Sequence, residues 1–77
     1  MITLPALVGA NIKRKRRVCE FSQVALSSKI HGITAGDLSK IEAGKINMTL
    51  KTAAKIAAAL GCHPREFFEE FEQESEK

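Results

Sequence analysis

Apolar residues recur at helical spacing near both ends of the chain. In the first part they occupy one face of a helix, with Pro5 in the first turn, and predict a helix over residues 4–19. The positions that define this face are Leu4, Leu7, Val8, Ile12 and Cys19. Further along, the stretch "TLKTAAKIAAALG" is rich in alanine and high in helix propensity, and Gly61 supplies a stop signal.

Three helix starts follow one repeated pattern: an apolar residue, a hydroxyl residue that can cap the helix, and a second apolar residue four positions after the cap. The three sets are Phe21-Ser22-Leu26, Ile33-Thr34-Leu38 and Met48-Thr49-Ala53. The pattern is that of an N-cap with a hydrophobic staple, and Asp37 stands where a carboxylate can complete a capping box with Thr34. We therefore expect helices to begin at Ser22, Thr34 and Thr49.

A last helix is predicted to open at Pro64 and to carry Phe67, Phe68 and Phe71. With this segment the pattern gives five helices and no strand, which is an all-α domain. Alanine stands at Ala53 and Ala54 on the preceding helix. We expect Phe67 to point inward and fill the space that these small residues leave.

The two central helices are short and meet at Ile30-His31-Gly32-Ile33, which predicts a tight turn and hence a helix-turn-helix. The second helix of such a unit can enter the major groove of DNA. If Leu38 and Ile41 are its buried side, a step of about a hundred degrees per residue turns the opposite side outward. The outward positions are Gly36, Ser39, Lys40 and Ala43. A helical hairpin packed for structural reasons alone has a similar pattern, so the pattern by itself leaves both interpretations open.

Charge is divided unevenly along the chain. Residues 1–65 hold eleven Lys or Arg and three Asp or Glu, a net charge of +8, whereas residues 66–77 hold six Glu and one Lys, a net charge of −5. Such a division is typical of a basic body that binds a polyanion, with an acidic tail directed away from it. The alternative is that these are ordinary solvated surfaces.

The length of 77 residues allows one domain, residues 1–77, without a separate catalytic or ligand-sensing module. The longest apolar run, Leu4 to Ala10, is too short to cross a membrane, and no basic segment precedes it, so we expect a cytoplasmic protein without membrane contact. We expect no catalytic residues, cofactor or small-molecule ligand, because no nucleophile motif or phosphate-binding loop is present. Cys19 and Cys62 lack the spacing of metal ligands, and we expect both to be reduced, buried side chains with no metal site.

Several linked motifs resemble the Cro/C1-type (XRE) family of helix-turn-helix DNA-binding proteins. They are "VGANIKRKRR", "SQVAL", "LSKIEAGKINMTL" and "KIAAALGCHPREFF", which together span Val8 to Phe68. The resemblance implies an all-α, five-helix, lambda-repressor-like domain, with the helix-turn-helix at about residues 22–43 and an acidic C-terminal helix and tail at about residues 64–77. The "NMTL" stretch and the short length are most similar to controller proteins of restriction-modification systems.

The chain also departs from the family pattern. It is one residue longer than usual between Gln23 and Glu42, with the extra residue near His31-Gly32. The other departures are Lys15 for an apolar residue, Glu20 for glycine, Ser27 for alanine and Met48 for proline.

The resemblance implies a set of DNA-binding residues. Ser22 and Gln23 would contact the DNA backbone, although Ser22 is also explained by helix capping alone. The residues expected in the major groove are Thr34, Ala35, Gly36, Ser39 and Lys40.

Within the major groove, Lys40 can read guanine and Ala35 can contact a thymine methyl group. Gly36 is explained either by close approach to DNA or by a frayed helix start. Lys45 and Asn47, in the loop that follows, would contact phosphate.

The resemblance also implies a structural ion pair between Arg16 and Glu42, which would join the first and third helices. A carboxylate in the last turn of a helix is disfavoured by the helix dipole, so Glu42 needs a partner of this kind.

The function that these features indicate is a sequence-specific transcriptional regulator that binds a two-fold operator in double-stranded DNA as a homodimer. We expect Phe68 and Phe71 to be shared with the partner subunit, because three phenylalanines are more apolar surface than a short terminal helix usually exposes. The alternative is that all three rings complete the monomer core. A different class also remains open, namely an antitoxin or adaptor that mainly binds another protein and uses DNA binding for autoregulation.

Overall fold

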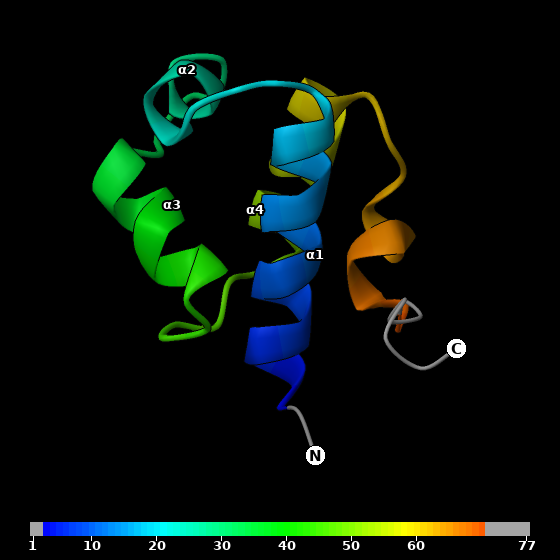
Figure 1. The fold of residues 1–77 in the computed structure, drawn as a ribbon. Coiled ribbons are helices and arrows are strands. Elements are labelled where there is room, and N and C mark those ends of the chain that lie inside the picture. Colours follow the sequence, from blue (N-terminus) through cyan, green and yellow to red (C-terminus); the bar gives the residue numbers. More distant parts are fainter. Residues whose placement is uncertain (1–2, 71–77) are drawn as a thin grey trace.

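The structure is a computed structural model that describes residues 3–70. These residues form helices joined by loops (Figure 1). The elements are α1 (Leu4–Val18), α2 (Gln23–Ser27), α3 (Ala35–Glu42), α4 (Leu50–Leu60) and a 3₁₀ helix, η1 (Pro64–Phe68). Residues 3–70 contain no β-strand, so the expectation of an all-helical chain is confirmed for this range.

The three predicted helix starts are confirmed. Ser22, Thr34 and Thr49 are the N-caps of α2, α3 and α4, and each hydroxyl oxygen accepts a hydrogen bond of 3.0 to 3.1 Å from the backbone N–H three residues later. At α3 the capping box is complete, because the Asp37 carboxylate accepts from the Thr34 N–H at 3.1 Å. Gly61 caps the end of α4 in the left-handed conformation, with φ of 72°.

The expected fifth α-helix is not present as such. The segment that opens at Pro64 is a 3₁₀ helix of five residues, and Glu69 after it is extended (φ −92°, ψ 140°). The carbonyl oxygens of Phe67 and Glu69 accept hydrogen bonds of 2.8 and 2.7 Å from the side chain of Asn11, which fixes the segment to α1. Phe71 lies outside the described residues.

Two smaller expectations were also wrong. The connection between α2 and α3 is longer than a four-residue turn, because α2 ends at Ser27 and α3 begins at Ala35. Ile30 in this connection is 6% exposed and joins the core, so the backbone must reach inward before it turns at Gly32 (φ 88°). Cys19 is exposed, because it caps the C-terminal end of α1.

The core lies between α1, α3 and α4, with α2 packed against α3 and η1 packed against α1 and α4. In Figure 1, α1 lies between α3 on one side and η1 on the other, with α4 behind it. The five large apolar side chains that are completely buried come from all five elements: Ile12, Leu26, Leu38, Ile56 and Phe67. The inward position of Phe67 is therefore confirmed.

Glycine allows α1 and α3 to approach each other closely. A Cβ atom at Gly9 would lie 2.3 Å from the carbonyl oxygen of Ile41 and 2.8 Å from that of Glu42. Such distances are far inside van der Waals contact, so only glycine fits at this crossing. The contact fixes the distance of α3 from α1 and leaves the opposite side of α3 on the surface.

Candidate nucleic-acid interface

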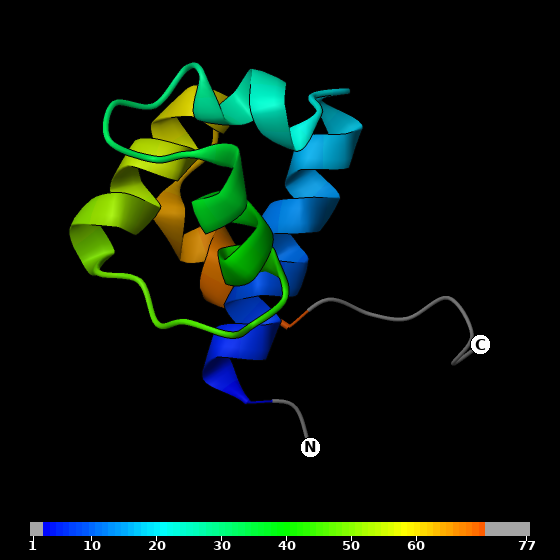
Figure 2. The same ribbon diagram turned by 90° about the vertical axis from the view of Figure 1, so that its left-hand side faces the viewer.

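The outer side of α3 is an exposed surface made of small and polar side chains. Leu38 and Ile41 are buried, with 0% and 4% of their surface exposed. The exposed residues include the four that the helical pattern predicts, Gly36, Ser39, Lys40 and Ala43, and also Asp37. Figure 2 views the molecule from the side of α3, where this helix lies in front of the core.

The first turn of α3 is firmly fixed by its own side chains. Thr34 and Asp37 form a reciprocal capping box, so two backbone N–H groups at the helix start already have partners. Thr34 is exposed and Ala35 is half-buried, and both lie at the end of α3 that the capping box fixes. A frayed start therefore does not explain the glycine that follows.

Gly36 is not required by the fold. Its φ lies outside the left-handed region, and an added Cβ would meet only the Thr34 hydroxyl oxygen, at an ordinary contact distance of 3.7 Å. In a helix, glycine costs about 1 kcal/mol relative to alanine. Gly36 therefore lowers helix stability although no contact within the protein requires it. On an exposed helix face, such a glycine indicates a surface that another molecule approaches closely.

The remaining residues expected at DNA flank α3. Lys45 and Asn47 are exposed in the loop after the helix. Gly44, just before Lys45, is in the left-handed conformation (φ 74°). Ser22 is exposed at the start of α2 and its hydroxyl caps that helix. Gln23 is half-buried, and its amide nitrogen donates to the Glu42 carboxylate at 3.0 Å, which leaves one amide hydrogen for another acceptor.

Arg16 and Glu42 meet between α1 and α3. The guanidinium Nε donates to Glu42 Oε2 at 2.7 Å and Nη2 donates to Oε1 at 3.0 Å, and only 3% of the Glu42 side chain is exposed. The hydrogen bond to Glu42 raises the pKa of the Arg16 guanidinium above its ordinary value. The pair thus fixes the last turn of α3 against α1, next to the loop that carries Lys45.

Sequence reasoning missed two contacts that hold the C-terminal segment. Asn11 is completely buried and its amide binds two carbonyl oxygens of that segment. Lys15, which departs from the family pattern, forms an ion pair with Glu66, and this contact lowers the pKa of the Glu66 carboxyl and raises that of the Lys15 ammonium. A buried asparagine on an otherwise apolar face was the one signal that could have revealed the first contact.

The surface around α3 suits a large, regular polyanion. Lys40 and Lys45 are the cations on and beside this helix, and the Asp37 carboxylate is engaged by the helix start. Within residues 3–70, no group of three or more His, Cys, Asp or Glu side chains is placed to hold a metal ion. No helix in the same range has the length and apolar character needed to span a membrane.

Comparison with known proteins agrees with this geometry. Residues 12–67 match the helix-turn-helix family HTH_3. The chain belongs to this family of XRE-type DNA-binding proteins. The resemblance to the Cro/C1-type proteins is thereby confirmed.

The chain is also similar in structure to the restriction-modification controller protein C.AhdI from Aeromonas hydrophila. The TM-score is 0.78 at 28% sequence identity, and the similarity covers 83% of this chain and 91% of the other. A search among curated proteins gave no significant match.

Proposed function

We propose that this chain is a non-catalytic transcriptional regulator that binds a two-fold DNA operator as a homodimer, with α3 in the major groove. The observation that carries the proposal is the outer face of α3, which is exposed, capped at its start and contains a glycine that the fold does not need. A helix presented in this way can come close to base edges without steric hindrance. The whole chain would act as a single helix-turn-helix domain, with the acidic C-terminal residues outside the DNA interface.

The division of roles follows from position and chemistry. Lys40 lies on the outer face of α3 and would donate to guanine, while Ala35 would contact a thymine methyl group. Ser22 and Gln23 at the start of α2, and Lys45 and Asn47 in the loop after α3, would bind phosphate oxygens. Thr34 and Ser39 would contribute hydroxyl groups to the groove.

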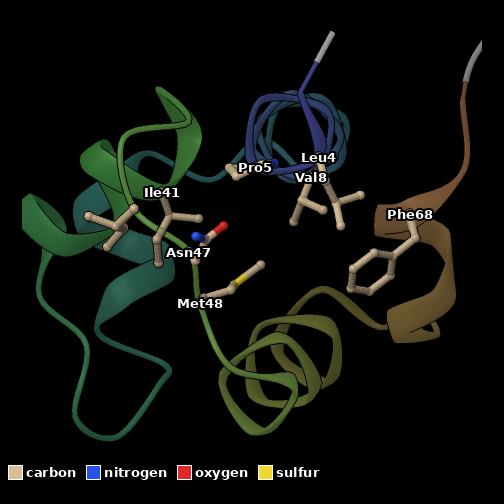
Figure 3. Close-up of a pocket in the computed structure, with 8 residues that line it drawn as sticks. Leu4, Pro5, Val8, Ile41, Asn47, Met48 and Phe68 are labelled. Atoms are coloured by element: carbon tan, nitrogen blue, oxygen red, sulfur yellow. The ribbon is translucent and has the colours of Figure 1, made fainter.

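The dimer is supported by an exposed apolar surface at one end of the molecule. Of the large apolar residues that are exposed in the described range, Leu4 (60%), Ile46 (40%) and Phe68 (38%) line one shallow hollow together with Met48. Figure 3 shows the Phe68 ring and the Leu4 side chain facing this hollow from η1 and α1. We infer that a second copy covers this surface and contacts Phe68.

The similarity to a restriction-modification controller supports regulation of a restriction-modification operon as the biological setting. The chain aligns with that protein over most of both lengths, so the likeness involves the whole domain. An antitoxin or adaptor role is the competing function, and the gene next to this one distinguishes them: a toxin gene favours the antitoxin, and an endonuclease-methyltransferase pair favours the controller.

Selection of bound fragments from genomic DNA tests the proposal. We expect the recovered fragments to share an inverted repeat whose half-sites lie about 34 to 36 Å apart, one helical turn, because each subunit presents one α3. Fragments without a shared sequence, or a shared sequence without two-fold symmetry, would contradict it.

A further inference from the structure

The outer face of α1 carries a group of cations that lies apart from the α3 surface. Lys13, Arg14 and Arg17 are all exposed and share one side of the helix at spacings of one, three and four residues. They line a shallow depression together with Ala10 and Val18. In Figure 2, where α3 faces the viewer, α1 lies behind α3 and to one side of it.

The C-terminal segment leaves the domain beside this basic face. Asn11 binds the carbonyl oxygens of Phe67 and Glu69, and the Arg14 guanidinium donates to the Asn11 Oδ1 at 3.2 Å. Glu69 is therefore held beside Asn11, one helical turn before Arg14, and Glu70, the last described residue, follows it. The rest of the chain must begin its path at this point.

The chain beyond Glu70 is complementary in charge and long enough to cover the face. Residues 71–77 read "FEQESEK" and hold three glutamates, which follow Glu69 and Glu70. Seven residues can span up to about 25 Å when extended. Asn11 to Arg17 covers only about 9 Å along a helix, so the tail reaches every cation of the face.

We propose that the acidic tail, residues 71–77, binds in cis along the basic face of α1 formed by Lys13, Arg14 and Arg17. A single exposed ion pair is worth little, but several glutamates attached next to several cations act at a high effective concentration. The bound tail neutralises part of the positive field of α1. It thereby weakens binding to DNA of arbitrary sequence while leaving the α3 surface free. The ratio of specific to non-specific affinity therefore rises.

Docking itself is measured without DNA. The probe is the full chain, compared by NMR with the variant Glu72→Gln/Glu74→Gln/Glu76→Gln, which keeps Phe71 and hence the proposed dimer contact. At low salt we expect the backbone amide resonances of residues 13–18 to differ between the two proteins, to converge at high salt, and to be independent of protein concentration. Unchanged resonances of α1 would overturn the proposal, and so would differences that grow with protein concentration, which would mean binding to another copy.

The expected effect of the tail on DNA affinity rests on the proposed function. It is measured by fluorescence anisotropy with a duplex of random sequence over a series of salt concentrations. Neutralising the tail should tighten binding by several-fold and steepen the slope of log K against log salt by about 2 units, since each released cation contributes about 0.9. Failure to bind any DNA would contradict the proposed function, while the NMR experiment would still decide whether the tail docks.

A matched pair of backgrounds separates docking from net charge. In the variant Lys13→Gln/Arg17→Gln the neutralised tail should have a much smaller further effect on DNA binding, because two of its three partners are gone. In Lys51→Gln/Lys55→Gln, which removes the same charge from the exposed side of α4, the effect should persist in full. An equal effect in both backgrounds would show a long-range charge effect and overturn the proposal.

Discussion

Arg16 of α1 and Glu42 of α3 are joined by two parallel hydrogen bonds of 2.7 and 3.0 Å, in an enclosed position where both side chains have further partners. Gln23 donates to the same carboxylate at 3.0 Å, and the remaining Arg16 nitrogen, Nη1, donates to the Phe21 carbonyl oxygen at 2.8 Å. The network therefore connects α1, the start of α2 and the end of α3. It sets the angle at which α3 is presented.

Replacing Glu42 with alanine should destabilise the protein by about 3 to 5 kcal/mol, because an enclosed guanidinium loses its charge partner. Urea denaturation followed by circular dichroism measures the free energy of unfolding. The control is Glu66→Gln, which removes the charge from the half-exposed pair with Lys15 and should cost far less. A loss below about 1 kcal/mol for Glu42→Ala, as is typical of surface pairs, would show that the network is not important for stability.

Glu20 occupies a position where glycine would be more stable. It is the one non-glycine residue with positive φ in the described range (63°), and it ends α1 with the hydrogen bonds Glu20 N–H to Arg17 and Phe21 N–H to Arg16 that define a Schellman motif. We expect Glu20→Gly to stabilise the protein by about 1 kcal/mol, since a left-handed conformation costs other residues that much.

The control at this position is Glu20→Ala, which removes the charge but keeps a Cβ atom in the left-handed region. Thermal unfolding should show a raised midpoint for the glycine variant alone. Equal midpoints for the two variants would mean that charge, and not backbone strain, determines the effect.

Gly36→Ala should separate stability from DNA binding. We expect the free energy of unfolding to rise by up to about 1 kcal/mol, because the site has room for a methyl group and alanine favours the helix. Affinity for the selected operator should fall, because the methyl group obstructs close approach of α3. Denaturation and operator titration of the same protein check both halves.

The contrasting variant is Gly9→Ala, whose new Cβ would clash with the backbone of α3 at Ile41 and Glu42. It should destabilise the fold strongly. If Gly36→Ala instead bound the operator as tightly as the original protein, Gly36 would not face the DNA.

The apolar hollow predicts the effect of Phe68→Asp on assembly. By sedimentation equilibrium at micromolar concentration, we expect the original chain to be a dimer and the variant to be a folded monomer. Leu50→Asp is the control, since Leu50 is 76% exposed but does not line the hollow, and it should remain a dimer. A monomeric original chain, or a Phe68→Asp protein that unfolds, would contradict the proposed interface.

Local chemistry made much of this fold predictable. The starts of α2, α3 and α4 depend on side chains that bind backbone groups only three residues away, so Ser22, Thr34 and Thr49 could be identified as caps from the sequence. The outward face of α3 follows from helical periodicity in the same way. The DNA-binding roles assigned to that face remain predictions.

Contacts between distant residues were not predictable by the same means. The Asn11 amide binds carbonyl groups 56 and 58 residues later, and nothing in the sequence near Asn11 specifies where those carbonyls lie. The same holds for Gln23, which the family resemblance assigned to the DNA backbone but whose amide also donates to Glu42. The Asn11 contacts also account for the short last helix, because they bind the backbone at Glu69 to α1.

The most direct test of the proposed function compares Lys40→Ala with Lys45→Ala on the selected operator and on a scrambled duplex, over a series of salt concentrations. Lys40→Ala should reduce discrimination between the two duplexes by about 1 to 3 kcal/mol, because it removes a base contact. Lys45→Ala should weaken binding to both duplexes equally and reduce the salt slope by about one unit, because it removes a phosphate contact. Equal losses on both duplexes for both variants would contradict the assignment of α3 as the helix that reads the DNA sequence.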